Sequence, residues 1–171
     1  MEVLISNRQK KVKLNLKKIR MLAEEILQFE GVAENTELSI LFCEDDEMQK
    51  LNHHYMGKDR PTDVLAFPLE EEEFETEVRL LGDVAIDVET AFRQSAEHGH
   101  SVGLEIAFLL THGLLHLLRY DHLTKAEMVL MKEREETICR HLSEKKLLKG
   151  LEETRNSPLI KRAAQKPRDH H

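Results

Sequence analysis

Hydrophobic residues recur along this chain at two spacings, which predict a mixture of helices and short strands. In residues 12–30 they recur every three or four positions, as in a helix with one buried face: Leu16, Ile19, Leu22, Ala23, Ile26 and Leu27. Capping residues and the same spacing predict four further helices: from Asp45 or Asp46 to Tyr55, from Asp87 to Glu97, from a cap at Ser101 through Leu118, and from Thr124 to about Lys149. The helix that follows Ser101 is apolar on nearly every side, so we expect it to be buried in the centre of the fold.

Alternating or wholly apolar runs between turn residues predict four short strands, over residues 3–6, 37–43, 64–67 and 80–86. The acidic stretch 70–77 is expected to be a solvated loop. Helices and strands follow one another without a regular βαβ alternation. We therefore expect an α+β fold in which a small mixed β-sheet of about four strands packs with five or so helices.

The length of 171 residues suits a single domain, which we place at residues 1–149. From Gly150 onward the chain becomes polar and contains Pro158 and Pro167. We expect residues 150–171 to form a disordered C-terminal tail, because such a segment has too little apolar surface to pack.

The chain carries 25 basic and 32 acidic residues, a formal net charge of −7. This balance argues against binding of nucleic acid by the whole surface, but it leaves room for a local basic groove. The two cysteines, Cys43 and Cys139, are far apart and predict reduced thiols. The first residues lack the apolar core of a signal peptide, and no apolar run approaches the roughly 20 residues of a membrane span. A cytoplasmic protein with no membrane contact is expected.

Three histidines in and after the central helix predict a metal site. His112 and His116 are four residues apart, so their side chains share one helix face. A continuous helix would place His122 away from that face, but a helix that ends near Arg119 lets the chain bend back towards it. Imidazoles among leucines are costly to bury without a partner, and a metal ion supplies one. Three histidine ligands leave a fourth position open, as in a catalytic zinc site.

The same spacing occurs in metzincin peptidases, whose motif is H-E-x-x-H-x-x-G-x-x-H. In this chain the glutamate position is occupied by Gly113 and the glycine position by Arg119. Because that glutamate is the general base of peptide hydrolysis, its absence counts against a peptidase. Zinc is the preferred ion, although three imidazoles also suit nickel, copper or iron.

Two stretches resemble the YbeY family of bacterial rRNA-maturation endoribonucleases. Residues 112–122, H-G-L-L-H-L-L-R-Y-D-H, resemble the family motif H-G-x-L-H-L-x-G-Y-D-H. Residues 55–68, Y-M-G-K-D-R-P-T-D-V-L-A-F-P, resemble Y-R-x-K-D-x-P-T-D-V-L-S-F-P, and Leu81-Gly82-Asp83 resembles a third, shorter motif, L-G-D. The resemblance covers roughly residues 1–148.

The resemblance implies a zinc-dependent, single-strand-specific endoribonuclease that acts in 16S rRNA 3′-end maturation and ribosome quality control. Its partners would be single-stranded RNA, 16S rRNA and the small ribosomal subunit; the sequence predicts no oligomeric state. One Zn²⁺ per chain would be held by His112, His116 and His122.

Three further residues are candidates for catalysis. Lys58 and Arg60 could stabilise charge on the phosphorus, a role for which Arg119 is a further candidate. Asp121 could orient a metal ligand or simply cap the turn.

Two departures from the family pattern affect these expectations. Arg119 stands where the family motif has glycine, which costs roughly 1–2 kcal/mol if the backbone there is left-handed. Met56 stands where the family has an arginine thought to serve activity. The alternatives are a metallopeptidase and a ribosome-binding factor with a mainly structural zinc, and Met56 strengthens the second.

Other polar residues receive ordinary structural interpretations. Histidines outside the 112–122 spacing are interpreted as surface residues: His53, His54, His98 and His100. Glu105 lies two turns before His112 and is expected to face solvent or form a salt bridge rather than to support the metal site. Asp83 is expected to be a turn or hydrogen-bonded strand residue.

Overall fold

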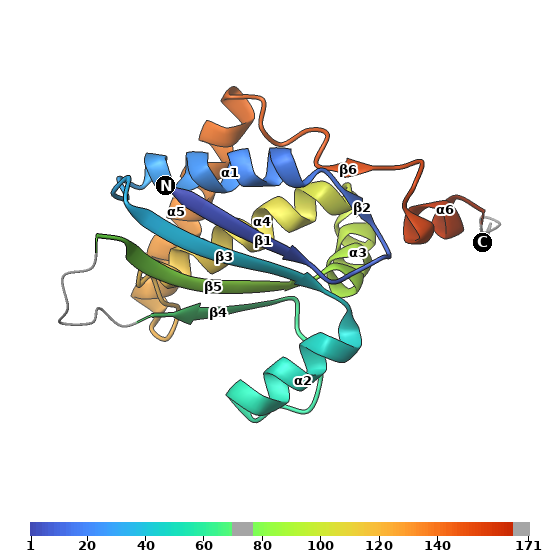
Figure 1. Ribbon diagram of the computed structural model, residues 1–171, viewed down its shortest axis with the longest axis horizontal. Helices are drawn as coiled ribbons and strands as arrows, with labels where there is room; N and C mark the ends of the chain where they lie inside the picture. The colour runs from blue at the N-terminus through green and yellow to red at the C-terminus, as the bar shows by residue number, and fades with distance from the viewer. Residues whose placement is uncertain (70–76, 166–171) are drawn as a thin grey trace.

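A four-stranded mixed sheet lies at the centre of the computed structural model, which describes residues 1–69 and 77–165 (Figure 1). Its strands are β1 (Glu2–Asn7), β3 (Thr36–Cys43), β4 (Val64–Pro68) and β5 (Arg79–Asp87), in the order β1-β3-β5-β4. β1, β3 and β5 are parallel, and β4 pairs antiparallel with β5. The predicted α+β fold with a four-stranded mixed sheet is therefore confirmed.

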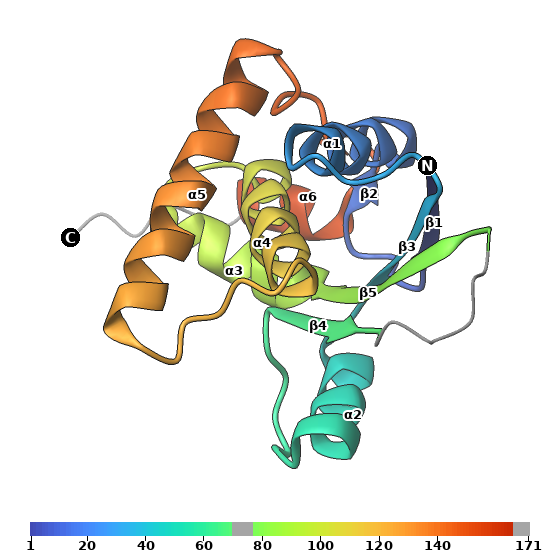
Figure 2. The ribbon, with the colours of Figure 1, turned by 90° about the vertical axis from the view of Figure 1, so that its left-hand side faces the viewer.

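Helices cover the two faces of this sheet unequally. α1 (Leu16–Phe29) and α4 (Val102–Leu117) lie on one face, whereas the shorter α2 (Asp45–Met56) lies on the other (Figures 1 and 2). α3 (Val88–His98) and α5 (Lys125–Glu144) both contact α4. α4 contacts α1, α3, α5, β4 and β5, which makes it the buried central helix that its apolar sequence predicts.

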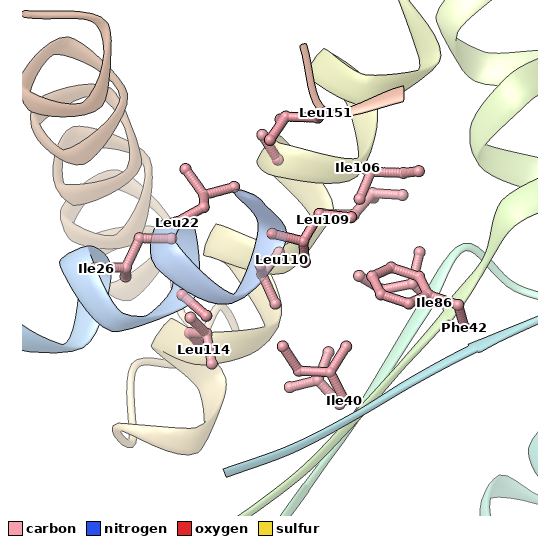
Figure 3. Close-up of a cluster of buried hydrophobic side chains, with 14 of the residues drawn as sticks. Leu22, Ile26, Ile40, Phe42, Ile86, Ile106, Leu109, Leu110, Leu114 and Leu151 are labelled. Atoms are coloured by element: carbon pink, nitrogen blue, oxygen red, sulfur yellow. The ribbon is translucent and has the colours of Figure 1, made fainter. Parts of the chain in front are cut away.

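The main core fills the space between the sheet and the helices α1 and α4. Alternation along β3 turns Leu38, Ile40 and Phe42 to this side, each at most 1% exposed. They lie in one cluster with side chains from α1 and α4, as Figure 3 shows for Leu22, Ile26, Leu110 and Leu114. Because α4 is held on several sides by this packing, the residues that it presents at its C-terminal end are rigidly placed.

Two segments differ from the sequence-based expectation because they pair with each other. The first helix begins at Leu16, capped by Asn15, and residues 13–14 form β2 (Lys13–Leu14) instead of helix. β2 pairs antiparallel with β6 (Glu152–Glu153), and α6 (Pro158–Gln165) follows. The prediction of a disordered tail over 150–171 is therefore wrong for residues 151–165, while residues 166–171 lie outside the described part of the chain.

Hydrogen bonds explain why this C-terminal segment is structured. The Asn15 amide donates to the Leu151 carbonyl at 2.9 Å, and the Lys13 amide donates to Ser157 Oγ at 2.8 Å. Leu151 and Ser157 are fully buried. Leu151 and Ser157 anchor the segment, but its polar composition does not reveal this, because their partners lie at the other end of the sequence.

Helix caps are mostly where the sequence places them. Asp87, Ser101 and Thr124 each cap the following helix through their side chains, as predicted. The prediction that Asp45 or Asp46 caps α2 is wrong: Glu44 is the N-cap residue, and its side chain makes no capping bond. The predicted acidic loop lies almost wholly in residues 70–76, outside the described residues.

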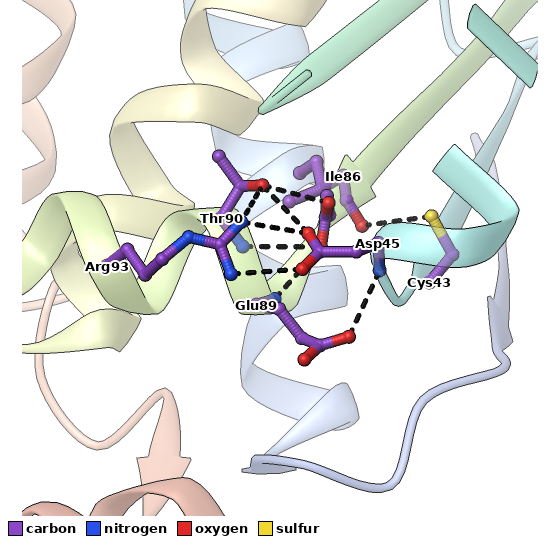
Figure 4. Close-up of polar contacts among 7 residues, drawn as sticks. Cys43, Asp45, Ile86, Glu89, Thr90 and Arg93 are labelled. Atoms are coloured by element: carbon purple, nitrogen blue, oxygen red, sulfur yellow. Dashed lines mark hydrogen bonds and ion pairs between the residues drawn. The ribbon is translucent and has the colours of Figure 1, made fainter. Parts of the chain in front are cut away.

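Asp45 instead takes part in a polar network that joins α2 to α3 (Figure 4). Arg93 donates two hydrogen bonds to its carboxylate, at 2.9 and 3.0 Å, and the Glu89 side chain accepts the Asp45 amide proton at 3.1 Å. Thr90 Oγ1 donates to Asp87 Oδ2 at 2.9 Å. Burial and the neighbouring Asp45 raise the pKa of Asp87 to about 8, whereas the hydrogen bonds from Arg93 lower the pKa of Asp45 to about 2.

Candidate metal centre

The three histidines singled out by their spacing lie together at the C-terminal end of α4. His112 and His116 project from the same helix face, with their Nε2 atoms 3.1 Å apart. The His122 ring centroid lies 4.9 Å from that of His116 and 5.9 Å from that of His112. One ligand atom from each of the three side chains lies within 4.8 Å of the other two, close enough to share one ion.

A left-handed turn at the end of α4 brings His122 back to this helix face. Arg119 has φ of +74°, and its amide donates to the His116 carbonyl at 3.0 Å. The Tyr120 amide donates to the Leu115 carbonyl, also at 3.0 Å. These two bonds form the Schellman motif, in which the left-handed position usually holds glycine. The arginine therefore occupies a backbone conformation that costs roughly 1–2 kcal/mol for a residue with a side chain.

A carboxylate from another helix holds one of the histidines. Glu135, on α5, places its Oε1 atom 2.6 Å from His112 Nδ1. This contact keeps the proton on Nδ1 and leaves Nε2, the atom that faces His116, free to bind a metal. Sequence reasoning missed Glu135, because the residue is 23 positions from His112 and no spacing rule connects two separate helices.

The site favours the protonation state that a metal requires. Burial is the main reason that the pKa of His116 lies below its usual value, and the neighbouring His112 and His122 lower it further. His116 is therefore a neutral imidazole at neutral pH, the form in which histidine donates a lone pair to a metal. His122 is exposed, so the ion would remain open to an exogenous ligand. Three imidazole nitrogens, one of them oriented by a carboxylate, fit a zinc ion.

Gly113 is enclosed by side chains of the sheet. A Cβ atom at this position would lie 2.8 Å from Val84 Cγ1 and 3.3 Å from Val64 Cγ2, so even alanine would be crowded. The glutamate that metzincin peptidases carry here would have to displace both valines. This packing adds a steric argument against the metallopeptidase alternative.

Lys58 and Arg60, predicted to take part in catalysis, are exposed on the loop between α2 and β4. The buried Asn52 fixes this loop: its Nδ2 atom donates to the Arg60 carbonyl at 2.8 Å, and its own carbonyl accepts the Lys58 amide at 3.3 Å. Within residues 1–69 and 77–165, neither cation forms a hydrogen bond or ion pair with the three histidines. Their catalytic role stays a prediction.

Asp121 and Asp83 have different surroundings. Asp121 Oδ1 accepts the backbone amide proton of His122 at 2.7 Å, which is the turn-capping arrangement among the two considered for it. Asp83 is exposed on the sheet face opposite α4, where it lines a groove of about 480 Å³ together with Arg8, Tyr55 and Phe67. The Tyr55 and Phe67 rings are 4.9 Å apart in this groove.

The exposure of the remaining histidines and of Glu105 agrees only in part with the expectation from the sequence. His53 and His54 are exposed, as expected. His98 is also exposed as expected, with 55% of its side chain accessible, whereas His100 is half-buried at 22%. Glu105 is only 4% exposed, so it does not face solvent. The salt bridge expected as one of two possibilities for Glu105 is present, with His98 and His100 as its partners, although no spacing rule connects these three residues.

Among the described residues, no helix is both long enough and apolar enough to cross a membrane.

Comparisons with known proteins agree with the resemblance found in the two motifs. The family model for Endoribonuclease YbeY matches residues 4–143. The protein named Endoribonuclease YbeY of Thermoanaerobacter sp. (strain X514) is 42% identical over 156 residues, which cover 84% of this chain and 98% of that protein. The protein of the same name from Clostridioides difficile (strain 630) is 39% identical over 149 residues, covering 84% and 97%.

A solved structure is also similar. The solution structure of TM1509 from Thermotoga maritima matches with a TM-score of 0.53 and 25% sequence identity, over 86% of this chain and 96% of that one. Family model, relatives and fold all cover the segment that carries the three histidines. The chain therefore belongs to the YbeY endoribonuclease family.

Proposed function

We propose that this protein is a zinc-dependent endoribonuclease that cleaves single-stranded RNA at the site of His112, His116 and His122. The observation that carries the proposal is the convergence of three imidazoles with one of them oriented by Glu135. The relatives with about 40% identity are named endoribonucleases, which supports RNA as the substrate.

The metal would be held by three nitrogen ligands, with further positions open to substrate or water. When bound, zinc supplies Lewis acidity to the site. The protein's own contribution is to hold the ligands: Glu135 fixes the tautomer of His112, the core packing of α4 fixes His116, and the turn at Arg119 presents His122.

Binding of RNA requires cations, although the protein as a whole is acidic. Lys58 and Arg60 are exposed on a loop anchored by Asn52, and Arg119 is exposed in the turn between His116 and His122. We assign phosphate contacts to these three side chains. The exposed Tyr55 ring, next to Phe67 in the groove on the sheet face opposite α4, offers a stacking surface for unpaired bases. Bases in a duplex cannot reach such a surface, which supports a preference for single strands.

We extend the proposal to a biological role in 16S rRNA 3′-end maturation and ribosome quality control, with the small ribosomal subunit of the cytoplasm as partner. This part rests on the family to which the chain belongs. A ribosome-binding factor with a structural zinc is the second candidate, and Met56 favours it. Met56 is 55% exposed at the end of α2 and has no charge with which to contact a phosphate.

A single substitution tests the proposal. His116→Ala should remove zinc from this site and abolish cleavage of a single-stranded RNA oligonucleotide, while the circular dichroism spectrum stays that of the folded protein. His54→Ala is the matched control, because His54 is exposed and outside the cluster. Cleavage by folded, metal-free protein would refute the proposal. Ribosome association that survives in the inactive variant would support the second candidate, and digestion of casein would indicate a peptidase.

A further inference from the structure

A second group of metal-binding side chains lies at the junction of α3 and α4. His98 is the last residue of α3, and His100 directly precedes Ser101, the N-cap residue of α4. Gly99 between them has φ of +71°, a left-handed conformation that reverses the chain. Glu105 projects from the first turn of α4 towards both rings. His98, His100 and Glu105, spread over eight positions of the sequence, therefore lie next to one another.

A single carboxylate oxygen is the centre of this group. Glu105 Oε2 lies 3.0 Å from His98 Nδ1 and 2.5 Å from His100 Nε2. Glu105 is 4% exposed, and in the described part of the chain no lysine or arginine pairs with it. A buried carboxylate is costly unless cations or strong donors compensate its charge. The two imidazoles are its partners here, and a metal ion bound by all three groups would neutralise it more completely.

The ligand set and its dimensions suit a first-row divalent ion. Two imidazole nitrogens and one carboxylate oxygen form a His₂Glu set, which is one of the known zinc ligand sets. One ligand atom from each of the three side chains lies within 4.8 Å of the others. A tetrahedral ion with ligands at about 2.1 Å holds them about 3.4 Å apart. The distances of 2.5 and 3.0 Å to Glu105 fall short of this by less than 1 Å, which small side-chain rotations can supply.

The surroundings combine support with access. The His100 ring packs edge-on against Phe108, with centroids 5.4 Å apart, which restricts its orientation. The His98 side chain is 55% exposed, so an ion can enter from solvent and keep an open coordination position. Glu105 and His112 are separated by seven residues, about 10 Å along the helix axis, so the two ions would not share a substrate atom.

We propose that His98, His100 and Glu105 form a second divalent-metal site, separate from the three-histidine site and able to bind Zn²⁺. The ion would join the end of α3 to the start of α4, the helix that carries His112 and His116. This site does not depend on the proposed function, because its ligands are distinct and its occupancy can be measured without RNA.

The test is zinc stoichiometry and thermal stability of the full chain, measured on metal-stripped protein by equilibrium dialysis with Zn²⁺ and by a thermal melt. Wild-type protein should bind two equivalents. His116→Ala should still bind one equivalent and should still melt at higher temperature when Zn²⁺ is added. The double variant His98→Ala/His116→Ala should lose that equivalent, because its remaining affinity for Zn²⁺ should be at least tenfold weaker. Its melting temperature should no longer rise when Zn²⁺ is added. His98 is exposed, so its removal should leave the fold intact.

Two matched controls complete the design. His53→Ala/His54→Ala removes two exposed histidines from the end of α2 and should leave the stoichiometry at two. His170→Ala/His171→Ala should do the same, which excludes the C-terminal histidine pair as the source of the second equivalent. One equivalent in the wild type with none in His116→Ala would overturn the proposal. Retention of one zinc equivalent in the variant that lacks both His98 and His116 would also overturn it. Failure of RNA cleavage with two equivalents bound would refute the proposed function and leave the second site intact.

Discussion

Glu135 Oε1 lies 2.6 Å from His112 Nδ1, so a residue on α5 determines which nitrogen of a histidine on α4 faces the metal centre. Removal of this acceptor leaves the ring free to change tautomer and to rotate. We expect Glu135→Ala to weaken zinc binding at the three-histidine site by about 10- to 100-fold. Competition with a chromophoric chelator measures this affinity. Glu136→Ala, one position along the same helix and exposed, should retain wild-type affinity. Equal affinities in the two variants would show that Glu135 does not support the site.

Arg119 holds a left-handed backbone conformation with φ of +74° at the end of α4. Glycine relieves the strain of about 1–2 kcal/mol but loses more conformational entropy on folding. Arg119→Gly should therefore raise the free energy of unfolding by a net amount of about 1 kcal/mol, as measured by urea denaturation. Lys146→Gly is the matched control, since Lys146 has φ of +59° away from the metal centre. Both substitutions should stabilise the fold. Only Arg119→Gly should lower RNA cleavage, because only Arg119 is assigned a phosphate contact. A destabilised Arg119→Gly protein would contradict the strain argument.

Gly113 lies against the sheet with no room for a side chain. Although alanine favours a helix more than glycine does, Gly113→Ala should lower the free energy of unfolding by about 1–3 kcal/mol, because its methyl group would press on Val84. Val84→Ala should partly relieve this clash. In a double-mutant cycle the combined variant should be at least about 1 kcal/mol more stable than additivity predicts. Strictly additive effects would show that Val84 is not the residue that excludes larger side chains.

Much of the fold could be predicted from local pattern, because that pattern reports which side of each element is buried. The strands at Thr36–Cys43 and Arg79–Asp87 and the helices capped by Asp87 and Thr124 are where alternation and capping place them. The proximity of the three histidines was also readable, since i and i+4 share a helix face and Arg119 marks the turn. These features depend on residues close together in the sequence.

The features that could not be predicted depend on contacts between distant segments. Asp45 is of a residue type that often caps helices, but Arg93 on another helix binds its carboxylate. Residues 13–14 continue a helical pattern, yet they pair with β6. Glu135 reaches His112 only because α5 packs beside α4. For Asp45 and residues 13–14, the tertiary contact contributes more free energy than the local propensity that it replaces.

Asp87 gives the stability of this protein a specific pH dependence. Its pKa is raised from 3.8 to about 8 in the folded protein by burial and by Asp45, so the folded state keeps a proton that the unfolded chain releases. Stability that rests on a raised carboxyl pKa is complete below the unfolded value and declines as pH rises towards the folded value. The free energy of unfolding should therefore fall between about pH 4 and pH 8. The lowered pKa of Asp45 acts in the opposite direction, but only between about pH 2 and pH 4.

Asp87→Asn should flatten this decline, because the amide keeps the hydrogen-bonding shape of the protonated acid without titrating. Urea denaturation at pH 5, 6.5 and 8 measures the slope. Glu89→Gln is the control on the same network: Glu89 contacts the Asp45 amide, and its replacement should preserve the decline. Identical slopes in wild type and Asp87→Asn would show that Asp87 does not hold the proton.

Met56 occupies the position at which the family motif has arginine, and its side chain is 55% exposed. If a cation is missing there, Met56→Arg should raise kcat/KM for single-stranded RNA by about tenfold or more. The gain should shrink with added salt, since contacts to phosphates are screened. Met56→Gln, similar in length but uncharged, should leave kcat/KM unchanged. An equal gain from glutamine would show that the charge is not the limiting feature.

The pairing of β2 with β6 affects the order in which parts of the protein fold during synthesis. The Lys13 amide can form its hydrogen bond only after Ser157 has been made, 144 residues further along the chain. At the usual 5–20 residues per second, synthesis of the intervening residues takes roughly 7–29 s. During that interval the sheet and α4 can assemble, but residues 13–15 have no partner for their outer edge. The pairing of β2 with β6 therefore forms only after residues 151–157 have been synthesised, and in chains that stop before Leu151 residues 13–15 stay unpaired.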